Sequence, residues 1–186
     1  MPTVAAIEPT DFCSRCGFPW TDCECVPAAP AQSTREMVGQ HPTILIDTRE
    51  QLPLRFGRAG HETRTERVLL PCGDYSLRGL SAEVAIERKS LADLTACCGK
   101  ERARFIEQIE RMRSYRFRAL VVEARLCEVQ IGAYQSRILP QSVEGTLVKV
   151  AHDYGVPVWM AEDAGGAATL VEHMLCREWK NARKAK

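Results

Sequence analysis

The sequence lacks any apolar run long enough to cross a membrane. Its first residues also lack the basic start and the apolar core of a secretory signal. These two absences predict a cytoplasmic protein without membrane spans, in a compartment that keeps thiols reduced. Internal repeats and low-complexity tracts are missing as well, and the 186 residues fit one ordinary domain with an appendage.

Net charge is also small, at +1, but it is unevenly placed. Residues 1–40 carry a net charge of −3, and the remainder carries +4. The stretch 100–118 holds seven bases and three acids, which equals that whole excess. Such a stripe is typical either of a nucleic-acid-binding surface or of a solvated helix face, and charge alone favours the solvated face.

The nine cysteines are odd in number, and their uneven spacing does not favour a disulfide framework. Four of them lie in the pattern Cys-x2-Cys-x6-Cys-x-Cys, at Cys13, Cys16, Cys23 and Cys25. Four thiolates within reach of one point suit tetrahedral Zn²⁺, which would supply the folding energy of so short a segment. We therefore expect a structural zinc-binding segment at 1–26 and a Pro- and Ala-rich linker at 27–40. The alternative is a disordered tail with reactive thiols.

Residues 41–186 alternate between strand-like and helix-like patterns. Strands are expected at 43–47, 66–70, 74–77, 83–88, 119–124 and 156–160. Helices are expected after Ser90 and at 98–115, 142–154 and 166–180. A hairpin followed by alternating helices and strands predicts an α/β domain, with a mixed β-sheet flanked by helices.

Two carboxylates and a lysine fall at the ends of the expected hairpin strands. Gly73 permits a tight turn before Asp74, and Glu87 and Lys89 share one face of the next strand because strand side chains alternate. If the two strands pair, Asp74 and Glu87 lie close together and repel each other unless a cation sits between them. Hard oxygen ligands of this kind suit Mg²⁺. Ordinary surface ion pairs are the alternative.

Three further positions extend this pattern. Asp47 ends the first strand, where a third carboxylate can join the metal site, and Arg49 can clamp a phosphate. Arg88 points away from Glu87 and can brace the site through an ion pair with another acid. Asp93 follows Ser90 by three residues, which is also the spacing of an ordinary helix capping box.

Together these residues resemble the nuclease domain of the XPF family, over about 43–176. The matching positions are Asp47, Arg49, Glu50, Gly73, Asp74, Glu87, Arg88, Lys89 and Asp93, followed by Arg104 and Gln108 in the next helix. The resemblance implies a restriction-endonuclease-like fold and Mg²⁺ or Mn²⁺ chemistry. It also implies structured or branched DNA as substrate, and it allows a homodimer through this domain. The chain is most similar to the compact, free-standing versions carried by bacteria and phages.

The basic stripe can be reinterpreted beside such a site. We expect Lys100, Arg102 and Arg104 to contact DNA phosphates, with Gln108 added by the resemblance. Arg111, Arg113, Arg116 and Arg118 are expected on the solvated face. The sequence thus predicts a metal-dependent DNA endonuclease. The alternatives are a non-catalytic DNA-binding partner subunit and a restriction-like nuclease acting on plain duplex or ends.

Overall fold

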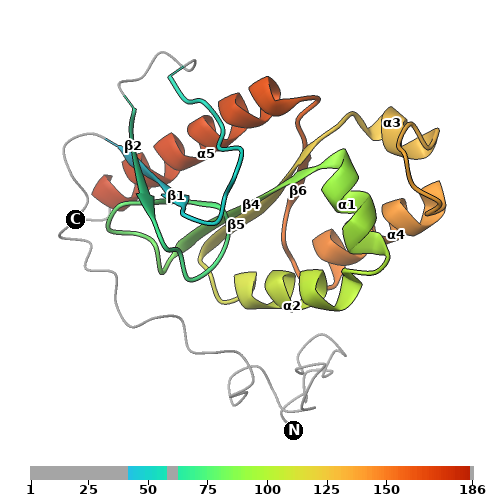
Figure 1. Ribbon diagram of the computed structural model, residues 1–186. Helices are drawn as coiled ribbons and strands as arrows, with labels where there is room; N and C mark the ends of the chain where they lie inside the picture. The colour runs from blue at the N-terminus through green and yellow to red at the C-terminus, as the bar shows by residue number, and fades with distance from the viewer. Residues whose placement is uncertain (1–41, 58–62, 185–186) are drawn as a thin grey trace, which may run out of the picture.

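The computed structural model describes residues 42–57 and 63–184 (Figure 1). The four clustered cysteines and the expected linker at 27–40 lie outside the described residues, so the zinc site stays a prediction. All five cysteines in the described part are free thiols. No helix in that part combines the length and the apolar composition needed to span a bilayer.

A six-stranded mixed sheet forms the centre of the domain, in the order β2-β1-β3-β4-β5-β6. The strands are β1 (Thr43–Asp47), β2 (Arg64–Val68), β3 (Tyr75–Leu77), β4 (Val84–Ser90), β5 (Phe117–Glu123) and β6 (Val158–Met160). β3 pairs antiparallel with both β1 and β4, whereas the β1–β2, β4–β5 and β5–β6 pairs are parallel. The expected hairpin and the mixed α/β class are confirmed.

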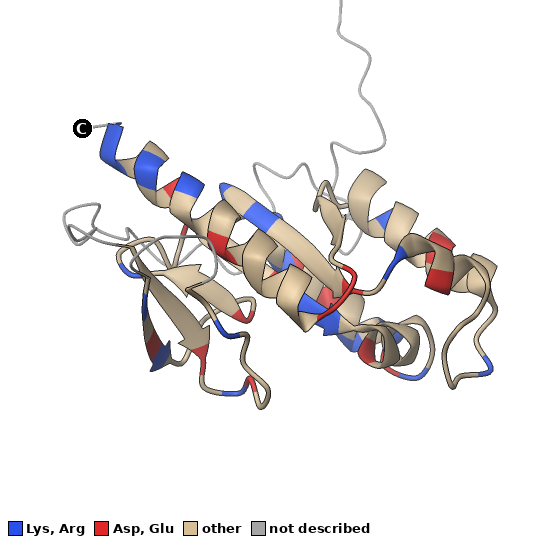
Figure 2. Ribbon diagram, turned by 90° about the horizontal axis from the view of Figure 1, so that it is seen from above, with Lys and Arg blue, Asp and Glu red and all other residues tan. Residues whose placement is uncertain are grey.

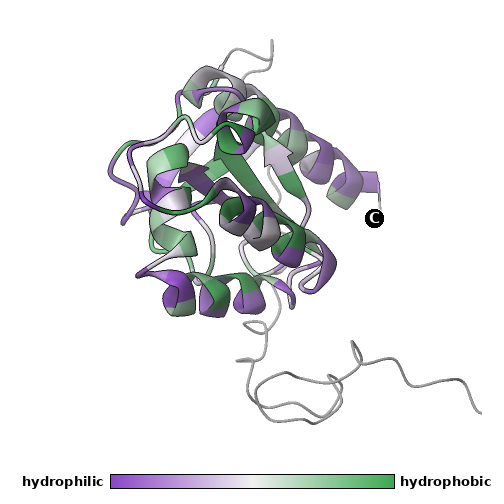
Figure 3. Cartoon of the chain, turned by 90° about the vertical axis from the view of Figure 1, so that its right-hand side faces the viewer, coloured by the Kyte–Doolittle hydropathy of each residue, from purple (hydrophilic) through white to green (hydrophobic). Residues whose placement is uncertain are grey.

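Helices cover both faces of this sheet (Figure 1). They are α1 (Leu91–Cys98), α2 (Arg102–Met112), α3 (Leu126–Gln130), α4 (Pro140–His152) and α5 (Ala164–Lys184). One buried apolar cluster joins α1, α2 and α4 to one face, and a second joins α5 to the other. Figure 3 shows these apolar segments concentrated along the sheet and on the inner faces of the helices.

The sequence of β4 shows how the two faces are divided. Val84 and Ile86 pack in the cluster beneath α5, and Ala85 packs in the cluster beneath α1 and α2. Because side chains alternate along a strand, Glu87 and Lys89 follow Ala85 onto the second face. The strand therefore carries its carboxylate and its lysine to the end of one apolar layer.

Two helical segments differ from expectation. The single helix predicted at 98–115 begins only at Arg102, because α1 ends at Cys98 and Gly99 caps it. Helix α3 was not predicted, since five residues are too few to show a helical period. Its first turn is held by a capping contact in which the Arg125 backbone N–H donates to Glu128 Oε2 over 2.7 Å.

Helix α5 extends four residues beyond its predicted end. Basic side chains gather at this end of the helix (Figure 2), with Arg183 and Lys184 in the last turn. Cations there complement the negative end of the helix dipole. Arg183 also lies 4.8 Å from the centre of the Trp179 ring, which adds a cation–π contact.

Candidate active site

The strand register brings three carboxylates side by side at one edge of the sheet. Ile46 lies opposite Tyr75, and Tyr75 lies opposite Ile86. One residue further along these antiparallel pairs, the Asp47 N–H donates to the Asp74 carbonyl over 2.9 Å, and the Asp74 N–H donates to the Ile86 carbonyl over 2.8 Å. Asp47 at the end of β1, Asp74 just before β3 and Glu87 within β4 therefore lie next to one another on one face of the sheet, as the hairpin prediction implied for the last two.

Gly73 makes this close pairing possible. Its φ is +75°, a conformation that strongly favours glycine. A Cβ at this position would also lie only 2.9 Å from the Ile86 carbonyl oxygen in the backbone of β4. Any side chain would thus push β3 away from β4 and separate Asp74 from Glu87.

A cleft of about 440 Å³ opens over these strand ends. Nine of the predicted site residues line it: Asp47, Arg49, Asp74, Glu87, Arg88, Lys89, Asp93, Arg104 and Gln108. Lys100 and Arg102 do not line it. The cleft therefore unites residues that are up to 61 positions apart, counted from Asp47 to Gln108.

Glu87 lies at the floor of this cleft and is fully buried. One carboxylate oxygen accepts a hydrogen bond from the Lys89 ammonium and the other from the Gln108 amide. Burial, with the nearby charge of Asp74, raises the pKa of Glu87 to about 7. Burial acts to lower the pKa of Lys89, but the charges of Glu87 and Asp74 outweigh it and raise that pKa, so the lysine keeps its proton at neutral pH.

Asp74 is only partly buried and is fixed by the backbone of β4. Its Oδ2 accepts a hydrogen bond from the Arg88 N–H over 2.8 Å. Burial raises the pKa of Asp74 in spite of the positive charge of Lys89. Two neighbouring carboxylates whose ionised forms are both disfavoured form a donor set that fits a divalent cation, since Mg²⁺ commonly binds one or two carboxylates and keeps several waters.

Asp47 is committed to other partners. Its two oxygens accept hydrogen bonds from the backbone N–H and the guanidinium of Arg49 and from the backbone N–H of Leu70, at 2.7–2.9 Å. Burial acts to raise the pKa of Asp47, yet these hydrogen bonds lower it. Among the described residues, no group of three or more His, Cys, Asp or Glu side chains is arranged to hold a metal. The predicted metal-ligand role of Asp47 stays a prediction, and this geometry favours the positioning of Arg49 instead.

Arg88 lies on the opposite face of β4 from Glu87 and Lys89. Its guanidinium contacts Glu123 of β5 at 2.7 and 3.0 Å and Glu50 at 3.4 Å. All three side chains are at most 12% exposed. The network ties β4, β5 and the segment after β1 together at the wall of the cleft, which both Glu50 and Arg88 line.

Asp93 occupies the first turn of α1 and also lines the cleft. Its backbone N–H donates to Ser90 Oγ over 3.1 Å, and that hydroxyl donates to Asp93 Oδ2 over 2.7 Å. These contacts are the helix capping that the Ser90–Asp93 spacing predicted. A catalytic role for Asp93 stays a prediction.

The basic stripe divides differently from the sequence prediction. Arg104, Gln108 and Arg111 recur at i, i+4 and i+7 on one face of α2, and all three line the cleft. Arg111, which the sequence places on the solvated face, is exposed and also lines the cleft, as its helical spacing from Arg104 indicates. Arg102 instead donates to Thr146 Oγ1 of α4 over 2.7 Å. Glu50 and Glu123, the partners of Arg88, were not given a role by sequence reasoning either.

Comparisons with known proteins agree with this architecture. Two solved structures are similar: XPF from Aeropyrum pernix in complex with DNA (24% identity, TM-score 0.60, 75% of this chain and 66% of that chain covered) and XPF from Aeropyrum pernix (22%, 0.57, 74% and 61%). At these identities the likeness shows the fold, and the chain spans about two thirds of the length of those proteins. No curated protein matches it. The model of the ERCC4 domain matches residues 46–174, which is most of the chain. The chain belongs to the ERCC4 domain family.

Proposed function

We propose that this protein is a divalent-metal-dependent DNA endonuclease that hydrolyses phosphodiester bonds in structured or branched DNA. One observation carries the proposal: Asp74 and Glu87 lie side by side in an open cleft, and the wall that α2 contributes to this cleft carries Arg104 and Arg111. Membership of the ERCC4 domain family and the fold shared with XPF, one structure of which is bound to DNA, support it.

Asp74 and Glu87 are the residues that would hold Mg²⁺ or Mn²⁺. When bound, the cation would offset charge on the phosphate and lower the pKa of a water molecule. The protein contributes the fixed geometry: Gly73 and the Arg88 N–H hold Asp74, while Lys89 and Gln108 hold both oxygens of Glu87. A site supported in this way needs little rearrangement when a substrate arrives.

Lys89 and Arg49 would act on the phosphate itself. The Lys89 ammonium contacts Glu87 and lines the cleft, where it would offset negative charge on a phosphate oxygen or position the attacking water. The Arg49 side chain is 66% exposed although Asp47 orients it. It thus keeps donor capacity toward a phosphate oxygen at the rim of the cleft.

Arg104 and Arg111 would bind the DNA backbone on either side of the scissile phosphate. They lie two helical turns apart along the wall that α2 contributes, a separation of about 10 Å at 1.5 Å per residue. Such contacts provide affinity without reading base sequence. The same wall holds Gln108, which links the DNA-facing helix to Glu87.

The decisive experiment is a cleavage panel with the purified full chain. End-labelled duplex, single-stranded, flap and three-way-junction DNA are incubated with Mg²⁺, with Mn²⁺ and with chelator. We expect cleavage of the branched substrates in either metal and none in chelator. Binding without cleavage under every condition would identify a non-catalytic DNA-binding subunit, and equal cleavage of plain duplex would remove the branched-substrate part of the proposal.

A further inference from the structure

A second cavity, of about 680 Å³, lies beside the catalytic cleft. It is bounded by β2 and by the chain segment 51–56, which follows β1. Ile46 lines this cavity, whereas the next residue, Asp47, lines the catalytic cleft, so the two cavities lie on opposite faces of β1. We call the second cavity the β2 groove.

The lining of the β2 groove combines apolar surface with positive charge. Leu52, Pro53, Leu54 and Phe56 supply the apolar part, and Arg55 and Arg67 supply the charge. No carboxylate occurs among the described residues that line it. Arg67 donates to the carbonyl oxygens of Thr48 and Glu50 over 3.1 and 2.6 Å. Both partners are neutral, so its charge remains available to an anion.

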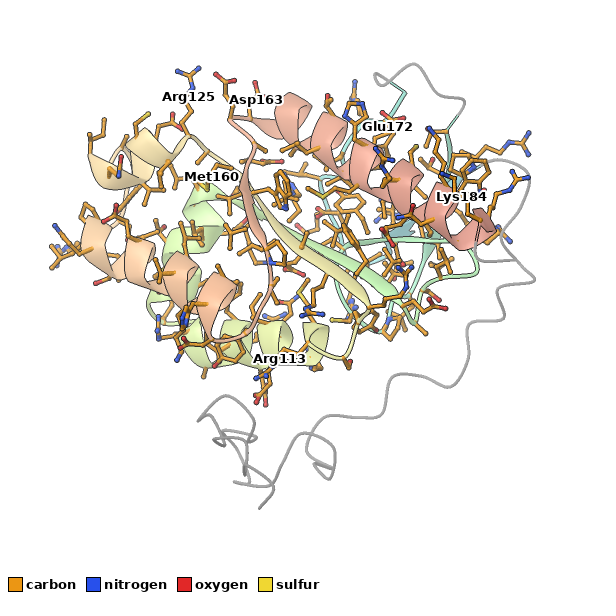
Figure 4. All side chains as sticks on the ribbon, turned by 180° about the vertical axis from the view of Figure 1, so that it is seen from behind. Arg113, Arg125, Met160, Asp163, Glu172 and Lys184 are labelled. Carbon is orange, nitrogen blue, oxygen red and sulfur yellow. The ribbon has the colours of Figure 1, made fainter. Side chains whose placement is uncertain are left out.

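The segment after β1, which forms one side of the groove, is held in place by contacts with β3 and α5. The Leu54 N–H donates to the buried Tyr75 hydroxyl over 2.9 Å, and the Phe56 ring packs edge-on against the Tyr75 ring, with 5.6 Å between ring centres. The Gly57 N–H donates to Glu172, a fully buried residue of α5 that Figure 4 labels, over 3.0 Å. Phe56 is therefore held in place, and the residue is partly exposed where it lines the groove.

Leu52 stands between the two cavities. It lines both of them, together with Gln51, and it is 75% exposed. Its backbone N–H donates to Glu50 Oε1 over 2.9 Å, and Glu50 contacts Arg88 at the wall of the catalytic cleft. An exposed leucine is thus anchored, through one acid, to the strand that carries Glu87.

We propose that the β2 groove binds the unpaired strand of a branched DNA substrate, and that Leu52 separates this strand from the duplex in the catalytic cleft. The inference rests on the proposed function, because it assigns the branch of the same substrate. Unpaired bases expose their faces and stack on aromatic side chains, while arginines bind the phosphates between them. Stacked duplex bases present no such faces. The apolar floor of the groove therefore favours a single strand over a duplex, and apolar side chains such as leucine are used by proteins to part base steps.

Equilibrium binding without divalent metal tests the proposal, because nothing is cut. Fluorescence anisotropy compares a labelled duplex bearing a single-stranded arm of ten dT with the same duplex lacking the arm. We expect the full chain to prefer the DNA with the arm. Phe56→Leu keeps the apolar volume but removes the stacking face, and it should reduce that preference by about tenfold. Leu52→Ala should reduce it by a smaller factor.

Ile131→Ala is the matched control, because Ile131 is 77% exposed and lies by α3 at the opposite end of the molecule from β2 (Figure 1). It should keep the wild-type preference. If circular dichroism shows that Phe56→Leu is unfolded, Arg55→Ala, at an exposed position of the groove, is measured in its place. This variant should also lower the ratio of the affinity for the DNA with the arm to the affinity for the DNA without it. If these groove variants keep the wild-type preference for the DNA with the arm, the proposal is overturned. If they keep that preference but change their oligomeric state, the groove is a protein-docking surface instead. A chain that cuts no DNA in Mg²⁺ would refute the proposed function, yet it would leave this ratio measurable.

Discussion

The two cavities that meet at Leu52 are built from opposite kinds of surface. Five acids and five bases line the catalytic cleft, and most of them contact one another: Asp47, Glu50, Asp74, Glu87 and Asp93 against Arg49, Arg88, Lys89, Arg104 and Arg111. The β2 groove has two arginines, no carboxylate among its described lining residues, and a largely apolar floor. The cleft holds charged side chains in fixed positions, which suits phosphodiester chemistry. The groove has an apolar surface and two arginines, which suit the binding of a strand without reaction. Because the two surfaces differ in this way, the two proposals predict that branch preference and cleavage can be altered separately.

The largest effect is expected when one carboxylate of the cleft is removed, because this should abolish cleavage and leave DNA binding intact. Asp74→Asn should lower the cleavage rate in Mg²⁺ by about a thousandfold or more, because a metal supplies several kcal/mol and each 1.4 kcal/mol is tenfold. DNA binding should remain or tighten, since a negative charge is lost. Cleavage rates on flap DNA and anisotropy on the same DNA measure the two quantities. Asp153→Asn, at an exposed acid after α4, is the control, and wild-type cleavage by Asp74→Asn would refute the metal assignment.

The cationic wall of the cleft is expected to give a smaller effect. Arg104→Ala combined with Arg111→Ala should lower the log–log salt slope of DNA binding by about two units, close to one per lost phosphate contact. The sequence predicted this role for Lys100 and Arg102 with Arg104. Lys100→Ala with Arg102→Ala is therefore the matched pair, outside the cleft, and should change the slope less. If Lys100→Ala with Arg102→Ala lowers the salt slope more than Arg104→Ala with Arg111→Ala does, the sequence prediction is correct instead.

The buried carboxylate of Glu87 should also make the free energy of unfolding depend on pH. The folded state keeps a proton on Glu87 up to a pKa of about 7, compared with 4.5 for an ordinary glutamate, so it binds more protons than the unfolded chain between these values. Without divalent metal, the free energy of unfolding should therefore fall as the pH rises from about 5 to about 8. Glu87→Gln should remove part of this fall, on the order of 1 to 3 kcal/mol. Urea unfolding at the two pH values measures it, and an unchanged pH dependence in the variant contradicts the raised pKa.

The smallest effect on cleavage is expected from the cysteine-rich segment. If Cys13, Cys16, Cys23 and Cys25 bind zinc, the full chain should carry about one Zn²⁺, as a four-thiolate site does. A chain starting at His41 should lose that zinc and keep Mg²⁺-dependent cleavage, because the cleft and the groove are both built from later residues. Native mass spectrometry counts the metal. Full-length protein without zinc, prepared without chelator, excludes the site, and loss of cleavage in a folded truncated chain would show that the first 40 residues take part.

The sequence predicted the sheet because local patterns carry it. The run at 43–47 and the alternation through Glu87 and Lys89 placed two strands and their faces correctly. The closeness of Asp74 and Glu87 followed from the pairing of the two hairpin strands. The break between α1 and α2 was predicted, but the start of α2 at Arg102 and the short helix α3 were not, because both depend on tertiary contacts and on single capping hydrogen bonds rather than on a period.

The sequence predicted the contacts between side chains less well than it predicted the positions of strands and helices. The residue types at Asp74, Glu87 and Lys89 indicated a metal site, but nothing local shows that both oxygens of Asp47 face Arg49 and Leu70. The place of Arg111 on the cleft wall becomes visible only when residues are counted around the helix rather than along the chain, because Arg104, Gln108 and Arg111 share one face of α2. The β2 groove joins β2 to a loop after β1, and no local pattern in either segment predicts such a long-range cavity.

Binding of Mn²⁺ followed by electron paramagnetic resonance tests the central claim most directly, because it observes the metal site without DNA or cleavage. The wild-type chain, Asp74→Asn and Asp47→Asn are titrated with Mn²⁺ at pH 8, where Glu87 is largely ionised. The account predicts that Asp74→Asn loses a Mn²⁺ site that the wild type has, whereas Asp47→Asn keeps it. Equal Mn²⁺ binding by Asp74→Asn and the wild type would contradict the assignment of Asp74 and Glu87 as the metal-binding pair.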